Sequence, residues 1–167
     1  MNLTKKMLTA FELSFLFLFL NVFVACVSSL DSYQGKTADQ NSRIALNGGS
    51  HSGVWQTDDL TVKYSYSRTP NNLRISGGVA LRDKVKDASD IVQEFVLQVS
   101  FLNGAGQALV TKELAISGYR ETLTKWDFDH NFELPVGTSA MAFSYDGQMG
   151  AGAAGGGAEE FWHDPFQ

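Results

Sequence analysis

Residues 60–67 read LTVKYSYS, in which apolar or aromatic side chains occupy every second position and polar side chains lie between them. Successive side chains of a β-strand point to opposite faces, so this alternation predicts a strand with one buried face and one solvated face. One position further along the chain, residues 69–72 (TPNN) favour a turn. The stretch therefore predicts a β-strand that ends in a turn.

The same alternation recurs in several short runs between residues 54 and 147. The large side chains that share one parity within each run are Leu73, Ile75, Val79 and Leu81; Phe95, Leu97, Val99 and Phe101; Trp126, Phe128, Phe132 and Leu134; and Met141, Phe143 and Tyr145. Turn-forming residues separate the runs, as at 103–106 (NGAG) and 135–137 (PVG). We predict an all-β fold with a single antiparallel β-sandwich over residues 54–147. A small β-barrel is the alternative, because local alternation does not distinguish a closed sheet from two stacked sheets.

The composition limits the classes of protein to which the chain can belong. Its 167 residues suffice for one domain of ordinary size, and 44% hydrophobic against 19% charged residues make a packed core feasible. The net charge of −5 argues against nucleic-acid binding, which needs a basic surface. The single cysteine excludes an internal disulfide framework and an all-cysteine metal site.

A basic start and a compact apolar run open the chain. Lys5 and Lys6 precede residues 13–20 (LSFLFLFL), and the apolar run continues to residue 26. This order is typical of a secretory signal, and the run is shorter than the roughly 20 residues that span a bilayer as a helix. We expect residues 1–25 to be a helical signal peptide that is cleaved.

The lone cysteine, Cys26, closes this apolar run. Residues 23–26 (FVAC) resemble the lipobox of bacterial lipoproteins, in which a small residue precedes an invariant cysteine. The resemblance implies cleavage before Cys26, acyl chains such as palmitate on it, and a lipid-anchored place in the cell envelope. By resemblance to Gram-negative lipoproteins, Val27 in place of Asp favours the outer membrane over the inner membrane, with the domain in the periplasm. A free cysteine in a signal anchor or in a cleaved secretory signal is the alternative.

Segments of small and polar residues flank the predicted sandwich. We predict a flexible spacer at residues 26–53 and a Gly/Ala linker at 148–158. Within the spacer, the apolar cluster at residues 44–46 (IAL) could add a short edge strand or pack on the domain. Residues 159–167 form a tail with three aromatic side chains, Phe161, Trp162 and Phe166. Three interpretations stay open for this tail. It folds back on an open edge or core end of the sandwich, which we favour, or its aromatic side chains are candidates to bind a partner, because aromatic residues dominate the energetics of small interfaces. A disordered end is the third.

One strand–turn–strand stretch carries a family resemblance. Residues 99–109 (VSFLNGAGQAL) resemble the corresponding part of small immunoglobulin-like bacterial domains of the FxLYD type, and residues 73–79 (LRISGGV) are similar to their preceding strand. The resemblance implies an immunoglobulin-like sandwich in a cell-envelope setting. It departs from the family at 101–103 (FLN), which lacks the family's Tyr and Asp, and it carries no catalytic residues to this chain.

Acidic side chains alternate with apolar ones in one predicted strand. They form a weak candidate metal site, the row Asp127, Asp129, Asn131 and Glu133. Carboxylate oxygens suit Ca²⁺, but Phe132 and Thr138 occupy the glycine and glutamate positions that an EF-hand loop requires. We therefore favour a solvated face that protects an edge strand, with no metal bound.

Two further groups could serve as sites, but we predict that both are structural. His130 shares the parity of Phe128, which favours a histidine at the core edge with one backbone partner. Trp55, Tyr64 and Tyr66 could stack against a sugar, but their alternation with polar residues favours the core.

The sequence contains no nucleophile motif and no metal-protease motif, so we predict that the protein is not an enzyme and needs no cofactor. We expect a lipid-anchored envelope protein with a binding or assembly role, whose partners are the membrane, through Cys26, and an envelope protein. A carbohydrate or cell-wall binding module is the first alternative, and a small envelope enzyme is the second. An exposed aromatic strip beside Asp127 and Asp129 would favour the carbohydrate module.

Overall fold

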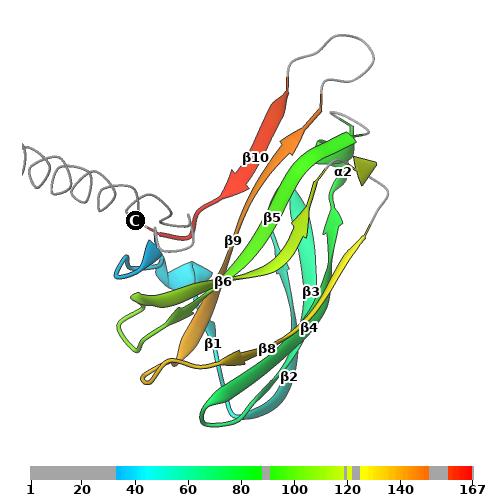
Figure 1. Ribbon diagram of the computed structural model, residues 1–167. Coiled ribbons are helices and arrows are strands. Elements are labelled where there is room, and N and C mark those ends of the chain that lie inside the picture. Colours follow the sequence, from blue (N-terminus) through cyan, green and yellow to red (C-terminus); the bar gives the residue numbers. More distant parts are fainter. Residues whose placement is uncertain (1–32, 88–90, 119, 122–124, 151–157, 167) are drawn as a thin grey trace, which may run out of the picture. The chain divides into compact units, whose positions relative to one another are not determined.

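The computed structural model describes residues 33–87, 91–118, 120–121, 125–150 and 158–166. These residues form an all-β sandwich of two antiparallel sheets, as the alternating runs predict (Figure 1). The predicted signal peptide, Cys26 and residues 26–32 of the predicted spacer lie outside the described residues. No helix in the described ranges is long and apolar enough to cross a membrane.

The first sheet has four strands in the order β2-β3-β4-β8. Its strands are β2 (Gly49–Gln56), β3 (Leu60–Arg68), β4 (Asn72–Leu81) and β8 (Trp126–Glu133). Tight turns join the first three, because the Thr57 amide donates to the Leu60 carbonyl and the Thr69 amide donates to the Asn72 carbonyl. Sequence neighbours therefore become sheet neighbours, whereas β8 joins the sheet from much later in the chain.

The second sheet is built around two long central strands, β5 (Ile91–Leu102) and β9 (Ala140–Met149). On its β5 side lie β6 (Ala108–Ser117) and the short β7 (Arg120–Glu121). On its β9 side lie β1 (Ile44–Ala45) and β10 (Glu159–His163), which pair with opposite ends of β9. Two short helices, η2 (Gln40–Ser42) and α2 (Asp83–Lys86), complete the described elements.

The core lies between the two sheets and uses the side chains that the alternation assigns to it. Its largest fully buried side chains come from both sheets: Phe95, Phe101, Phe143, Leu60, Leu73, Ile75, Leu97 and Met141. Each fully buried side chain of this size contributes about 1.5–3 kcal/mol of transfer free energy. The domain is thus held mainly by apolar burial, with no need of a disulfide.

The structure corrects the predicted boundary between spacer and sandwich. Within the described part of the spacer, β1 and most of β2 are strands, and Leu46 and Ala38 are buried. The compact unit begins at Tyr33. The breaker at Gly48 and Gly49 is the point where the chain passes from one sheet to the other, and Gly49 has a φ of 87° there. An edge strand with one exposed face needs few large apolar residues, which is why its composition resembles a spacer.

The structure also moves the boundaries at the C-terminal end. Strand β9 runs through Gln148 and Met149, which the sequence assigns to the linker, and the tail forms strand β10 (Figure 1). Residues 151–157 of the predicted linker lie outside the described residues. The tail is therefore a part of the second sheet.

Candidate binding site beside the C-terminal strand

The C-terminal strand β10 lies antiparallel along β9, with Glu159 opposite Met149 and His163 opposite Tyr145. Alternate side chains of a strand face opposite ways. Phe161 accordingly enters the core and keeps 6% of its surface exposed, whereas Trp162 faces outward and is 64% exposed. The pairing of β10 thus separates the two neighbouring aromatic side chains into an anchor and an exposed surface residue.

A glycine in β9, Gly147, leaves room for the ring of Phe161. A Cβ atom at Gly147 would lie within 2.8 Å of several ring atoms of Phe161, well inside van der Waals contact. The ring also packs against Phe95, at 6.1 Å between centroids, and against Tyr145, at 6.0 Å. A glycine inside an alternating strand is the sequence signal for such a close approach, and sequence reasoning missed it here.

The chain remains docked beyond β10. The Asp39 amide donates to the Pro165 carbonyl at 2.8 Å, and Phe166 stacks on Tyr33 at 4.6 Å between ring centroids. Two of the three predicted partner-binding side chains, Phe161 and Phe166, therefore pack on the sandwich. These two side chains follow the interpretation in which the tail folds back on the sandwich, and Trp162 alone of the three projects from the domain.

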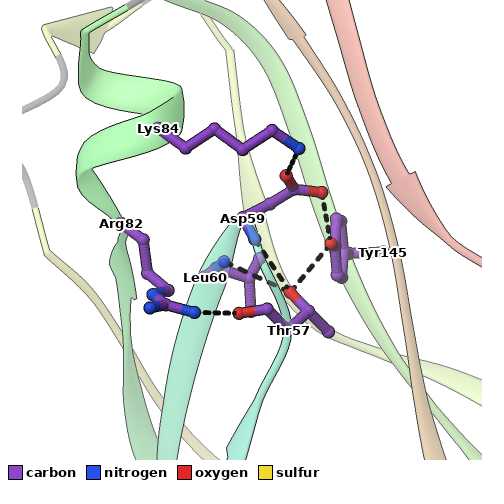
Figure 2. Close-up of polar contacts among 6 residues, drawn as sticks. All are labelled: Thr57, Asp59, Leu60, Arg82, Lys84 and Tyr145. Atoms are coloured by element: carbon purple, nitrogen blue, oxygen red, sulfur yellow. Dashed lines mark hydrogen bonds and ion pairs between the residues drawn. The ribbon is translucent and has the colours of Figure 1, made fainter.

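A buried carboxylate, Asp59, lies between the side chains of Lys84 and Tyr145 (Figure 2). The Tyr145 hydroxyl donates to one of its oxygens at 2.7 Å, and the Lys84 ammonium donates to the other at 3.0 Å. The Thr57 hydroxyl lies 2.9 Å from the Tyr145 hydroxyl and accepts hydrogen bonds from the amides of Asp59 and Leu60. These contacts tie the β2–β3 turn, α2 and β9 together, and sequence reasoning did not identify them.

The protonation of this cluster suits a structural role. Burial raises the pKa of the Tyr145 phenol above its ordinary value, and the hydrogen bond to the Asp59 carboxylate raises it further. The phenol therefore stays a neutral hydrogen-bond donor at physiological pH.

A small cavity of about 220 Å³ adjoins the cluster. Its lining residues come from the β2–β3 turn, α2, the end of β9 and strand β10: Asp59, Lys84, Val85, Met149, Glu159, Glu160, Phe161 and Trp162. Pockets for drug-sized molecules measure about 300–1,000 Å³, so this cavity suits a single side chain better than a whole ligand. Three carboxylates against one ammonium, with an exposed indole beside them, favour a cationic group.

The cluster yields a prediction about stability. We expect Tyr145→Phe to lower the free energy of unfolding by about 1–3 kcal/mol, because it removes the hydroxyl donor from a buried carboxylate oxygen. Lys84→Met should have a clearly smaller effect, because the Lys84 side chain is mostly exposed and its ion pair is screened by water. Urea denaturation of both variants measures the difference. A larger loss for Lys84→Met would contradict the assignment of Tyr145 as the main partner of Asp59.

His163 at the end of β10 predicts a pH dependence. Its ring packs against the rings of Trp55 and Tyr145, and its buried Nε2 atom has no hydrogen-bond partner among the described residues. Burial lowers the pKa of His163 below its ordinary value, although Asp164 and other acids oppose the shift. The unfolded chain therefore binds this proton more readily, so stability that is present above about pH 6.5 is lost as the pH falls below it.

Thermal unfolding between about pH 8 and pH 5 tests this expectation. The variant His163→Gln should lose less stability on acidification than the wild type. The control variant His51→Gln, whose side chain is exposed and bonded to the Gly48 carbonyl, should follow the wild type. Equal acid sensitivity of His163→Gln and the wild type would contradict the prediction.

The candidate metal row lies on the exposed face of β8. There Asp129 forms two hydrogen bonds with the Arg74 guanidinium, at 2.7 and 3.0 Å, so a cation already occupies the centre of the row. In the described part of the chain, no group of three or more His, Cys, Asp or Glu side chains is placed to hold a metal. All four side chains of the row are exposed.

The two other candidate sites are part of the domain's packing. His130 Nε2 lies 2.8 Å from the Leu114 carbonyl, which is the single backbone partner predicted for it. Tyr66 is buried, and Trp55 and Tyr64 pack against the core from half-buried positions. The preference for the core over a sugar-stacking platform is confirmed for these three residues.

No known protein family, no curated protein and no solved structure matches this chain.

Proposed function

We propose that this chain is a non-catalytic binding or assembly protein of the cell envelope, held at the membrane through lipid on Cys26. Its partner contact is the surface formed by Trp162 and the adjoining cavity. The sequence of residues 23–26 supports the anchor, and strand β10 supports the contact surface.

One observation carries the choice of surface. Trp162 is held outward on a strand whose neighbouring residue, Phe161, is anchored in the core. A rigidly placed tryptophan loses little conformational entropy on binding, and tryptophan is among the residues most enriched at binding hot spots. The carboxylates of Asp59, Glu159 and Glu160 beside it favour a partner segment with a basic side chain.

The carbohydrate alternative gains no such support. The outward positions beside the acidic row belong to β4 and β3 and hold Arg74, Ser76, Lys63 and Ser65. No aromatic strip lies there among the described residues, so the stacking surface that a sugar needs is not formed on that face.

A crosslinking experiment tests the proposed contact. A photo-crosslinking residue in place of Gln148, which pairs with Glu160 but does not line the cavity, is expressed in intact cells, with Trp162 retained or replaced by alanine. We expect a defined protein adduct that falls at least about tenfold in Trp162→Ala, as for a hot-spot residue worth about 2 kcal/mol. The matched control Ile116→Ala removes an exposed apolar side chain from β6 and should leave the adduct unchanged. An adduct that is insensitive to Trp162→Ala would contradict the proposed surface.

The anchor is tested separately by intact-mass analysis of the chain purified from membranes. We expect a mass that corresponds to cleavage before Cys26 plus acyl chains, and the loss of that modification in Cys26→Ala. An unmodified chain that begins upstream of Cys26 would contradict the lipid anchor while leaving the contact surface open to its own test.

A further inference from the structure

The edges of the two sheets differ in how well they are protected. Native proteins guard edge strands with charges, bulges, short length or covering elements, because an open edge pairs readily with another strand. Strand β8 carries the acidic row and is joined to β6 by the contact between His130 and Leu114. Strand β6 has two register shifts against β5, and β10 has five residues, of which two are glutamates. Each of these edge strands therefore has a feature that hinders pairing with a strand of another chain.

Within the described part of the chain, strand β2 has no such feature. It spans eight residues, Gly49–Gln56 (GSHSGVWQ), with no charged residue and no proline. Its register with β3 is continuous from end to end, without a bulge. It is the terminal strand of its sheet, and no described strand pairs with its outer side. It is also largely exposed, with 62% of the Val54 surface accessible.

The turn that follows β2 determines which backbone groups face the open side. The Thr57 amide donates to the Leu60 carbonyl, so Thr57 bonds toward β3. In an antiparallel pair, consecutive residues alternate between bonding toward the partner and facing away from it. The amides and carbonyls of Ser50, Ser52, Val54 and Gln56 therefore face the open edge. No described strand pairs with these backbone donors and acceptors. Their spacing along β2 is that of the hydrogen-bonding groups of any extended strand, so a further strand could pair with them.

We propose that β2 pairs with β2 of a second copy of this chain, antiparallel about a two-fold axis at Gly53. In this register, Ser52 of each copy bonds to Val54 of the other, and Ser50 bonds to Gln56. On the inner face, His51 of each copy lies opposite Trp55 of the other, which gives two aromatic cross-strand pairs. Because β2 is uncharged, self-pairing brings no like charges together within the pairing strands, and this favours a second copy as the occupant.

Pairing of eight-residue strands buries less area than the roughly 1,000 Å² of a stable interface, so we expect a concentration-dependent dimer. The two four-stranded sheets would then form one continuous sheet. The solvent-exposed faces of the two copies would lie on the same side of this sheet. This association does not depend on lipid at Cys26 or on a partner at Trp162.

The test measures the oligomeric state of the purified full-length chain in detergent, by sedimentation over a range of concentrations. We expect a monomer–dimer equilibrium whose dissociation constant rises at least tenfold in Val54→Pro, which removes one edge amide. Ser52→Lys should have a similar effect, because it places like charges beside the axis. The matched control is Ser65→Lys. Ser65 lies in β3, directly opposite Ser52 and on the same face of the sheet, so the variant adds the same charge away from the pairing edge. It should dimerise like the wild type.

Two further readouts separate a pairing defect from misfolding and identify the register. Circular dichroism and thermal unfolding should be alike for Val54→Pro, Ser65→Lys and the wild type. In a Cys26→Ala background, a mixture of Ser52→Cys and Val54→Cys chains should form disulfide dimers faster than either variant alone, because these positions face each other. A chain that stays monomeric at its highest soluble concentration, or a dimer that tolerates Val54→Pro and Ser52→Lys, would overturn the proposal.

Discussion

Gly77→Ala is expected to destabilise the domain by about 3 kcal/mol or more, at the upper end of the cost of overpacking. Gly77 lies in the middle of β4, opposite Tyr64 of β3. A Cβ atom at this position would overlap the backbone carbonyl oxygen of Lys63 and would lie 2.8 Å from the ring of Phe128. The carbonyl belongs to the neighbouring strand and cannot rotate away, so the substitution must separate the strands or bend them.

Gly48→Ala is the matched control for this substitution. No atom lies within 4 Å of a Cβ atom at Gly48, and its φ does not require a glycine. We expect it to leave stability unchanged or to raise it by up to about 1 kcal/mol, because alanine restricts the unfolded chain. Chemical denaturation of the two variants gives the comparison. Equal stability of Gly77→Ala and Gly48→Ala would contradict the close approach of β3 and β4 at this point.

Phe95→Ala is expected to lower the free energy of unfolding by about 3–5 kcal/mol, as for other fully buried aromatic residues. Phe95 is fully buried in β5, and its ring stacks on Trp126 at 4.7 Å between centroids. It also stacks on Phe161 of β10, at 6.1 Å and an interplanar angle of 11°. The substitution leaves a cavity between the sheets. It also removes the ring against which Phe161, the core-facing side chain of β10, packs.

Ile116→Ala serves as the control for Phe95→Ala. Ile116 is a large apolar residue in β6 that is mostly exposed, so its loss removes little buried area, and we expect a change within about 0.5 kcal/mol. Equilibrium denaturation with both tryptophan fluorescence and circular dichroism measures the two effects. A loss for Phe95→Ala that is no larger than that for Ile116→Ala would contradict its place between the sheets.

The sandwich core could be predicted because side-chain parity is a local property. Once residues 60–67 are recognised as a strand, their alternation already assigns Leu60, Val62 and Tyr66 to the interior, and all three are buried. Each following run repeats the same argument. What parity cannot supply is the order of the strands, because β8 and β9 reach their partners through contacts between residues far apart in the sequence.

The edges of the fold were harder to predict than its centre. Strand β2 has only Trp55 as a large apolar inward side chain, and its glycines and serines are also typical of a linker. The pairing of β10 likewise depends on Gly147, whose missing side chain makes room for Phe161. From their composition alone, such segments are predicted to be flexible. They form strands because they pair with a neighbouring strand that lies elsewhere in the sequence.

The cluster around Asp59 could not be predicted for a similar reason. Its shortest contact joins Asp59 to Tyr145, which is 86 residues away in the sequence. Neither residue belongs to a motif, and Tyr145 shares the parity of core residues. The choice of Trp162 among the three aromatic tail residues also needed the structure, because only the pairing of β10 shows which side chain faces outward.

Amide hydrogen exchange of the full-length chain tests most directly whether the C-terminal segment is a fixed strand that presents Trp162. We predict slow exchange of amides within Glu159–His163 in the wild type and in Trp162→Ala, because β10 is paired with β9 and the exposed indole does not hold it there. In Phe161→Ala the same amides should exchange rapidly, because the anchor of the strand is lost. Rapid exchange of these amides in the wild type would contradict the docked strand and, with it, the proposed contact surface.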